Sequence, residues 1–154
     1  MFTAKEVMTA PVITVTENQT LQDVIELIAK HSFSGVPVVN DEGIVTGIVS
    51  DTDIIRYSHQ INVVPLANLS GWISPHTDIS DLVAVRKGIE QLHRTKVRQI
   101  MTKKVFTVKE NGSINEIARL MSRRNINRIP VVDDLGKPIG IVTRANVVQC
   151  MTKT

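Results

Sequence analysis

Cysteine and aromatic residues are scarce in this sequence of 154 residues. The single cysteine, Cys150, excludes an internal disulfide and any zinc site built on several cysteines. Aromatic residues make up 3% of the chain, too few for the stacking platforms that bind single-stranded nucleic acid. A long stretch without charged residues, 58–77, contains two prolines and many polar side chains, so the sequence predicts no membrane-spanning helix.

The remaining composition is that of a globular protein. Hydrophobic residues make up 42% of the chain and charged residues 21%, which excludes intrinsic disorder. A chain of this length buries about two thirds of its unfolded surface, so it needs neither a metal nor a disulfide to fold. Lys5 and Glu6 interrupt the first apolar residues, so we expect no signal peptide. The single cysteine fits a reducing compartment, so we expect a cytoplasmic location.

Charge is distributed unevenly along the chain. Residues 1–93 carry five basic and eleven acidic side chains, a net charge of −6. Residues 94–154 carry thirteen basic and four acidic side chains, a net charge of +9. Such asymmetry is found in proteins that bind an anionic ligand or a nucleic acid, and in proteins that self-associate through unlike surfaces. It is also compatible with a solvated surface of uneven charge.

The sequence contains an internal duplication with an offset of 93 residues. Five short motifs of the first copy return in the second copy in one register, without a gap between residues 7 and 55. The matching segments are 7–9 with 100–102, 12–15 with 105–108, 17–18 with 110–111, 36–39 with 129–132, and 47–50 with 140–143. Single apolar matches arise by chance, but an ordered set in one register indicates a repeat.

The first half of each copy predicts a strand and a helix. A run of β-branched residues at 13–15 predicts the strand. Residues 18–20 offer helix-capping side chains, and apolar residues follow them at helical spacing. Ser113 is the capping residue in the second copy. We expect Gly35 to end the first helix, because glycine accepts the left-handed conformation beyond a helix C-terminus.

The second half of each copy predicts a hairpin followed by a helix. Residues 36–39 and 44–49 are the expected strands, joined by a turn at 40–43. The following helix begins near Ser50 or Asp51, and its counterpart begins near Thr143. Each copy is therefore a β-α-β-β-α unit.

The stretch between the copies, residues 58–95, is not repeated. Proline and glycine interrupt its first part, and apolar residues at helical spacing then predict a helix of about residues 78–93. This helix would close the core between the copies or, together with Trp72, face a partner. We therefore expect one repeat at 1–57, a linker at 58–95 and a second repeat at 96–154.

The ordered motifs resemble those of the cystathionine β-synthase (CBS) domain. They are Met-Thr, Val-x-Thr-Val, Val-Pro-Val-Val, and Gly-Ile-Val-Ser-x-x-Asp, and they occur over about residues 5–57 and, with variations, over 98–151. Two such copies are similar to the tandem pair called a Bateman module. The resemblance implies an α+β fold (the α/β-type CBS fold) of two units related by a pseudo-twofold axis. It also implies a flat homodimer formed through the helices, in which we expect unlike copies to face each other.

The resemblance also implies a nucleotide site. The aspartate of the Ser-x-x-Asp element, Asp53, would accept both hydroxyls of a ribose, for which two carboxylate oxygens are well suited. In ligand-binding pairs a basic residue at the position of Arg128 commonly reaches the phosphates, and a guanidinium fits them bidentately. Asp53 and Arg128 lie in different copies, and the pseudo-twofold arrangement implies that they share one cleft.

Two clefts of unequal quality are therefore predicted. The main cleft would be lined by Ser50, Thr52, Asp53, Thr102, Val105, Phe106, Asn127, Arg128 and Ile129. The weaker cleft would be lined by Thr9, Ile13, Thr14, Gly35, Val36, Thr143, Ala145 and Asn146. The second cleft lacks the carboxylate, because Asn146 stands at the position of Asp53, and it also lacks the arginine.

Catalysis finds little support in the residues. The four histidines are scattered, without an HExxH motif or cysteine partners, so we predict no catalytic residue, no metal and no catalytic cofactor. No glycine-rich phosphate loop is present, which disfavours a nucleotide hydrolase. Ser50 is interpreted as a helix cap rather than a nucleophile. Gly47 and Gly140 are interpreted as sites of close packing or of close approach to a ligand.

The leading interpretation is a non-catalytic regulatory module. It would bind an adenine ribonucleotide (AMP, ADP or ATP) between the two repeats and pass the signal to a partner protein or domain. Two alternatives stay open: a sensor of S-adenosylmethionine, and a module that binds nucleic acid through the basic second half. The basic charge favours a phosphate-bearing ligand over S-adenosylmethionine, and nucleic acid is the less favoured partner.

Overall fold

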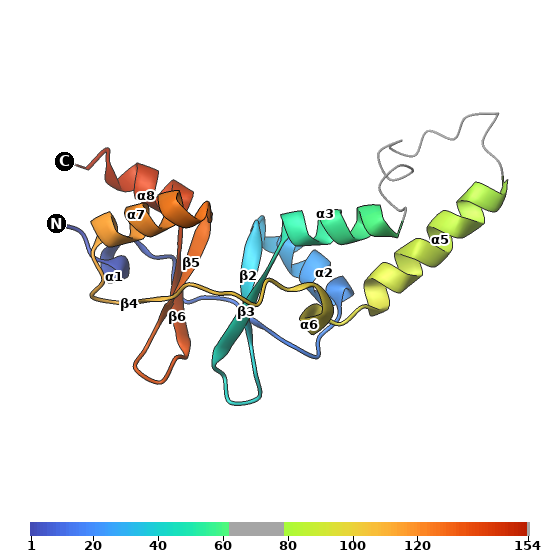
Figure 1. Cartoon of the computed structure of the whole chain (residues 1–154), viewed down its shortest axis with the longest axis horizontal. Coiled ribbons are helices and arrows are strands. Elements are labelled where there is room, and N and C mark those ends of the chain that lie inside the picture. Colours follow the sequence, from blue (N-terminus) through green and yellow to red (C-terminus); the bar gives the residue numbers. More distant parts are fainter. Residues whose placement is uncertain (62–78, 154) are drawn as a thin grey trace. The chain divides into compact units, whose positions relative to one another are not determined.

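The computed structural model describes residues 1–61 and 79–153 (Figure 1). Trp72 and the first part of the predicted linker lie outside the described residues. The chain divides into two compact units, and each unit contains segments of both sequence repeats. Unit 1 contains Met1–Thr16, Pro37–Ile48 and Lys103–Thr154, and unit 2 contains Glu17–Val36 and Val49–Thr102.

The two copies have the same order of elements. The first copy contains α1 (Ala4–Val7), β1 (Val15–Thr16), α2 (Leu21–His31), β2 (Gly35–Val39), β3 (Val45–Ser50) and α3 (Asp51–Gln60). The second copy contains α6 (Val97–Ile100), β4 (Val108–Lys109), α7 (Ile114–Arg124), β5 (Arg128–Val132), β6 (Pro138–Thr143) and α8 (Arg144–Cys150). Between them, α5 (Ile79–Arg94) occupies the stretch for which the sequence predicts a helix. The predicted α+β fold class is confirmed, with a short additional helix at the start of each copy.

The strands form two sheets of three strands, in the orders β1-β2-β3 and β4-β5-β6. The short first strand of each copy pairs in parallel with the second strand, Val15 opposite Val38 and Val108 opposite Val131. β5 and β6 are antiparallel, with a bulge between Val131 and Val132. The parallel pairs enclose a helix, as parallel connections require, and the antiparallel pair forms the predicted hairpin.

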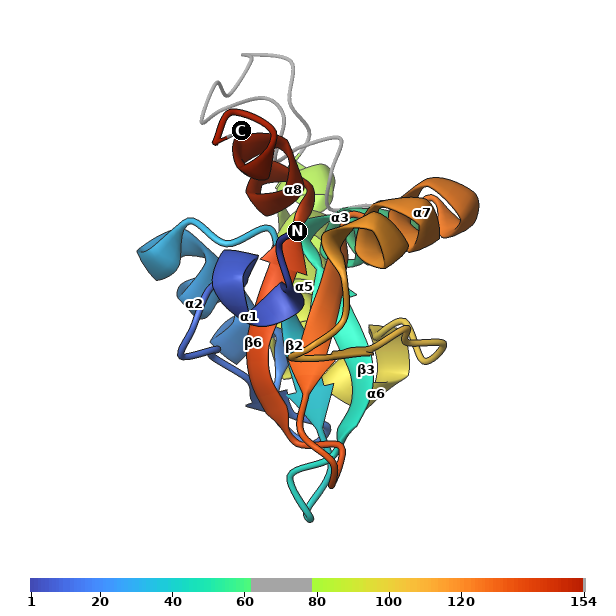
Figure 2. The same cartoon turned by 90° about the vertical axis from the view of Figure 1, so that its left-hand side faces the viewer.

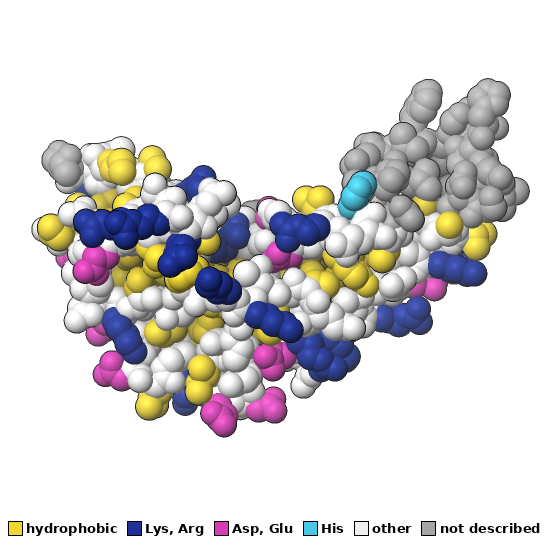
Figure 3. Space-filling view, in the orientation of Figure 1, with side chains coloured by type: hydrophobic (Ala, Val, Ile, Leu, Met, Phe, Trp, Pro, Cys, Tyr) yellow, Lys and Arg dark blue, Asp and Glu magenta, His cyan; other side chains and the backbone are white. Residues whose placement is uncertain are grey.

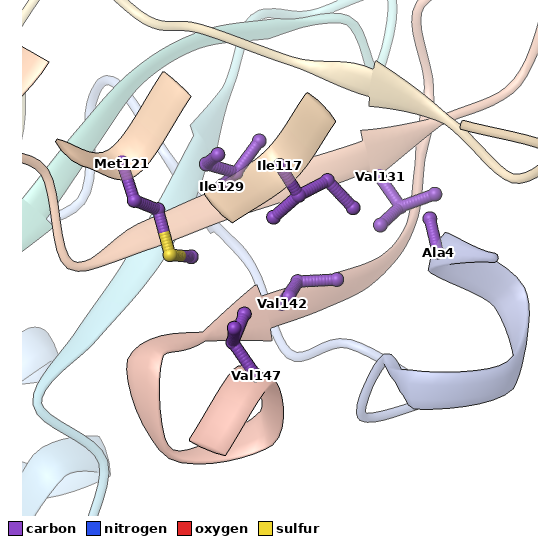
Figure 4. Close-up of a cluster of buried hydrophobic side chains, with 7 residues drawn as sticks. All are labelled: Ala4, Ile117, Met121, Ile129, Val131, Val142 and Val147. Atoms are coloured by element: carbon purple, nitrogen blue, oxygen red, sulfur yellow. The ribbon is translucent and has the colours of Figure 1, made fainter. Parts of the chain in front are cut away.

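A buried hydrophobic cluster of unit 1 lies between β5, β6 and the helices α1, α7 and α8 (Figure 4). Its buried side chains are Ala4, Ile117, Met121, Ile129, Val131, Val142 and Val147. Within this cluster Ala4 comes from the first copy, and it is fully buried. The cluster is therefore built mainly from the second copy, and the first helix of the chain completes it.

Hydrogen bonds and close packing hold α1 in unit 1, where it lies beside β6 (Figure 2). The amide of Ala4 donates to the carbonyl of Gly112 at 2.8 Å, and Thr9 exchanges two backbone hydrogen bonds with Ile141. Met8 packs against Gly140, where a Cβ would lie 2.3 Å from the Met8 sulfur. Of the two interpretations of Gly140, the structure supports close packing rather than a ligand contact.

Unit 2 shows the reciprocal arrangement. The amide of Leu21, at the start of α2, donates to the carbonyl of Thr95, and the amide of Val97 donates to the carbonyl of Gln19, both at 2.8 Å. Leu21 and Val97 are fully buried. The leading helix α6 of the second copy is thus part of the unit that contains α2 and α3 of the first copy.

Two local predictions are wrong. Gly35 does not end the first helix: α2 ends at His31, Ser32 takes the left-handed conformation with φ 57°, and Gly35 begins β2. Asn125 ends α7 in the same way, with φ 52°. The first strand covers Val15–Thr16 rather than residues 13–15, because parallel pairing with β2 begins only at Val15.

Over residues 1–61 and 79–153, no helix has both the length and the apolar character that crossing a membrane demands.

Candidate functional site

The helix α3 begins directly at the end of β3, and Ser50 is its N-cap. The Ser50 hydroxyl accepts a hydrogen bond from the Asp53 amide at 3.2 Å. In return, Oδ2 of Asp53 accepts from the Ser50 amide at 2.9 Å and from the Ser50 hydroxyl at 3.0 Å. This reciprocal pair is a capping box, which satisfies helix-end donors that have no partner within the helix. It explains why Ser50 and Asp53 lie three positions apart in the sequence.

The second oxygen of Asp53 is directed toward other groups of unit 2. Its Oδ1 accepts a hydrogen bond from the Thr102 hydroxyl at 3.3 Å and lies 3.7 Å from Nη1 of Arg56. Asp53 is only 7% exposed. A carboxylate this buried needs hydrogen-bonding or charged partners to offset its desolvation. One oxygen therefore serves the fold, and the other faces a hydroxyl and a cation.

Three other residues of the predicted main cleft, Ser50, Thr52 and Thr102, lie in unit 2 with Asp53. The structure brings together Thr102 and Asp53, which are 49 positions apart in the sequence and were both predicted as ligand contacts. Thr52 is exposed on the first turn of α3, and its amide donates to Asp51 Oδ1 at 2.7 Å. Ser50 is 6% exposed and its hydroxyl is used within the cap, which agrees with its interpretation as a cap rather than a nucleophile.

The start of α8 in unit 1 repeats this geometry with different chemistry. Oδ1 of Asn146 accepts from the Thr143 amide at 2.9 Å and from the Thr143 hydroxyl at 3.0 Å. The Thr143 hydroxyl accepts from the Asn146 amide at 3.2 Å. Because a backbone N–H can only donate, the side-chain oxygen of Asn146 must face it, and the side-chain nitrogen takes the other position. Where Asp53 offers an acceptor oxygen, Asn146 therefore offers a donor.

The other five residues of the predicted main cleft lie in unit 1. Arg128 is half-buried at the start of β5, directly opposite Thr143 of β6, and the Asn127 carbonyl accepts from the Arg144 amide at 2.9 Å. The Ile129 side chain is fully buried in the core, so only its backbone could contact a ligand.

Val105 is half-buried in the segment before β4. The structure thus brings Arg128 next to Thr143, and its grouping with Asp53 stays a prediction.

Phe106 already has a partner within unit 1. The guanidinium carbon of Arg124 lies 5.0 Å from the centre of its ring, a cation–π arrangement. Arg124 is one of three exposed arginines on α7, with Arg119 and Arg123, and Lys and Arg side chains gather over this helix (Figure 3). The basic charge predicted for the second half of the chain is therefore concentrated in part on one helix.

The residues of the predicted weaker cleft are divided in the same way. Gly35 and Val36 begin β2 in unit 2, and the amide of Asp51 donates to the carbonyl of the preceding Ser34 at 2.9 Å. Six residues lie in unit 1: Thr9, Ile13, Thr14, Thr143, Ala145 and Asn146. Among the residues that the structure describes, no group of three or more His, Cys, Asp or Glu side chains is arranged to hold a metal.

Sequence reasoning missed Arg56, whose guanidinium approaches Asp53. A signal was present in the repeat itself. The residue at the same position of the second copy is Gln149, so the pair Asp53 and Arg56 is matched by Asn146 and Gln149. Both charges of the first copy are replaced by amides.

Known proteins share this sequence and fold. The chain is 36% identical to an uncharacterised protein of Methanocaldococcus jannaschii over 151 residues, 96% of this chain and 89% of that protein. It is 30% identical to the chloroplastic CBS domain-containing protein CBSX2 of Arabidopsis thaliana, over 88% of this chain and 56% of that protein. It thus spans most of the first relative and about half of the second.

Solved structures give the same result. The CBS domain of a CBS domain-containing membrane protein from Sphaerobacter thermophilus is 30% identical, with a TM-score of 0.74 over 96% of this chain and 86% of that chain. CBSX2 in complex with AMP is 26% identical, with a TM-score of 0.71 over 99% of this chain and 98% of that chain. The CBS domain profile matches residues 4–60 and again residues 97–153. The chain belongs to the CBS domain family and carries two of these domains in tandem.

Proposed function

We propose that this chain is a non-catalytic regulatory module that binds an adenine ribonucleotide and passes the signal to a partner protein or domain. The observation that carries the proposal is the buried carboxylate of Asp53. One of its oxygens is taken up by the helix cap, and the other faces Thr102 and Arg56. A carboxylate oxygen in such a position suits the hydroxyl of a ribose, and the start of α3 favours a nearby anion.

The similarity to CBSX2 supports the choice of nucleotide, because that protein has been solved with AMP. In the proposed main cleft, Asp53 binds the ribose hydroxyls and Arg128 reaches the phosphate together with Ser50 or Thr52. The adenine would lie against Val105, Phe106 and the backbone of Ile129. This assignment of residues is part of the proposal.

A second cleft, at Thr143 and Asn146, would bind the same ligand more weakly. The Asn146 side-chain oxygen is committed to the cap of α8, so it is not available to a ribose hydroxyl. A hydrogen bond to a charged group contributes about 1.5–3 kcal/mol. Loss of the carboxylate therefore weakens binding roughly 10- to 100-fold relative to the main cleft.

The oligomeric state is a separate part of the proposal. We expect a homodimer formed through the helices, with the acidic copy of one chain facing the basic copy of the other. Light scattering at micromolar concentration should then give about twice the chain mass of 17.1 kDa. A monomer mass would contradict dimerisation, and a dimer with like copies facing would contradict only the orientation.

A thermal-shift screen tests the ligand proposal. Saturation at about 100 times the dissociation constant stabilises a protein by about 2.7 kcal/mol. For a chain of this size, that raises the melting temperature by roughly 5–10 °C. We expect this rise with AMP, ADP or ATP. A rise with S-adenosylmethionine alone would favour the alternative sensor, and no rise with any of these compounds would contradict the proposal.

A further inference from the structure

Arg56 is placed to act on the same ligand as Asp53. It follows Asp53 by three residues on α3, and side chains of a helix point back toward its N-terminus. Its guanidinium therefore reaches over the first turn, where Nη1 lies 3.7 Å from Asp53 Oδ1. The Arg56 side chain is 67% exposed, whereas that of Asp53 is 7% exposed. One edge of the guanidinium thus faces a buried carboxylate while most of the group remains accessible.

This geometry suits the capture of a phosphate. At 3.7 Å the contact with Asp53 is an ion pair rather than a short hydrogen bond, so the donors of the guanidinium are not held by a bidentate carboxylate. The planar fork of arginine matches the oxygens of a phosphate. The site thus places an acceptor suited to ribose hydroxyls next to a cation suited to the attached phosphate.

The second copy shows that the fold does not need this charged pair. Asn146 and Gln149 occupy the corresponding positions, and Asn146 forms the same capping hydrogen bonds as Asp53, at the same distances. An ion pair with one partner so exposed contributes little to stability. Capping therefore does not account for the arginine, and its guanidinium stays largely accessible beside the buried carboxylate.

We infer that Arg56 contacts the phosphate of the nucleotide and is a specificity-determining residue of the first copy. The inference rests on the proposed nucleotide site and extends it. Asp53 recognises the ribose and Arg56 recognises the phosphate, so both groups come from one turn of α3. The neutral pair Asn146 and Gln149 lacks both functions, which restricts strong nucleotide binding to one site per chain.

Calorimetric titration with AMP and with adenosine tests this role, because the two ligands differ only by the phosphate. We expect Arg56→Gln, which introduces the residue of the second copy, to weaken AMP binding roughly 10- to 100-fold. Adenosine binding should change less than about twofold, since the ribose contact with Asp53 remains. The control Arg119→Gln removes an exposed arginine of α7 and should leave both affinities unchanged.

Each other outcome has a distinct meaning. Equal losses for AMP and adenosine would show that Arg56 only positions Asp53, and they would overturn the phosphate contact. Unchanged AMP binding in Arg56→Gln would overturn the inference while leaving the nucleotide site intact. Failure of the wild-type chain to bind AMP or adenosine would overturn this inference, and failure to bind ADP and ATP as well would overturn the proposed function.

Discussion

The helices α3 and α8 begin with the same hydrogen-bonded box but offer opposite chemistry beyond it. In α3 the box uses Ser50 and a carboxylate, and in α8 it uses Thr143 and an amide. The three hydrogen bonds have the same lengths in both boxes. Capping therefore accepts either residue, and the atom that points away from the cap distinguishes the two copies: an oxygen of Asp53 or the nitrogen of Asn146.

The leading helices show the same replacement of an acid by an amide. Glu6 of α1 accepts from the Thr3 amide at 2.7 Å, and Gln99 of α6 accepts from the Lys96 amide at 2.8 Å. Glu6 and Gln99 are related by the offset of 93 residues. The second copy thus keeps the helix caps and loses acidic charge, which contributes to the opposite net charges of the two halves.

Substitution of Asp53 should have the largest effect on the rise in melting temperature that AMP produces, and substitution of Asn146 should have little effect on it. Asp53→Asn should fold with little change in melting temperature, because Asn146 already forms this cap, but most of the rise produced by AMP should disappear. Asn146→Ala should leave that rise nearly intact. Thermal-shift measurements with and without AMP check both variants. Loss of the AMP response in Asn146→Ala but not in Asp53→Asn would show that the other cleft is the working one.

Gly140→Ala tests whether this glycine of the second copy serves packing. The added methyl group would collide with Met8, so we expect a loss of about 1–3 kcal/mol in the free energy of unfolding. Urea denaturation measures the change. In a Met8→Ala background the methyl group no longer meets the Met8 sulfur. Gly140→Ala should therefore lower the free energy of unfolding less in Met8→Ala than in the wild-type chain. Equal effects in the two backgrounds would contradict the packing role.

Removal of the capping hydroxyls should affect the two copies equally. Ser50→Ala and Thr143→Ala each delete an N-cap, which costs about 1 kcal/mol of stability. Chemical denaturation of the ligand-free protein compares them. A loss confined to one of the two variants would show that the caps are not equivalent, contrary to their matching hydrogen bonds.

The smallest effect is a pH dependence of α1 that α6 should lack. Hydrogen bonds from the Thr3 backbone amide and hydroxyl lower the pKa of Glu6 below its usual value. Because this pKa is lowered in the folded state, the ionised Glu6 stabilises the fold at pH values above the usual carboxyl pKa. This stabilisation is lost as the pH falls through the lowered pKa. Amide hydrogen exchange at acidic and neutral pH should show α1 fraying in acid. Equal fraying of α6, which has Gln99 at this position, would contradict the assignment.

Local signals in the sequence were sufficient for most of the fold. Serine and threonine before an apolar helical pattern predicted the caps at Ser50 and Ser113 and a helix start near Thr143, which the structure confirms. These signals are local because a cap bonds to residues three positions away. The end of α2 was missed, because Ser32 takes a left-handed conformation that serine adopts only uncommonly, whereas glycine at Gly35 was the stronger but misleading signal.

Long-range relations were beyond the reach of single-sequence patterns. Nothing in residues 1–9 indicates that they complete the core of the second copy, because that contact depends on tertiary packing around Ala4 and Met8. The contact between Thr102 and Asp53 is also long-range, and the family resemblance, rather than spacing, pointed to both residues. Arg56 could have been found by comparing the two copies position by position, because Gln149 replaces it.

Calorimetric titration of the wild-type chain with AMP tests the central claim most directly, because it gives affinity and stoichiometry together. The account predicts one strong binding event per chain, with any second event roughly 10- to 100-fold weaker. Asp53→Asn should remove the strong event, since it replaces the carboxylate and retains the cap. Two events of equal affinity in the wild-type chain, or a strong event that survives in Asp53→Asn, would contradict it.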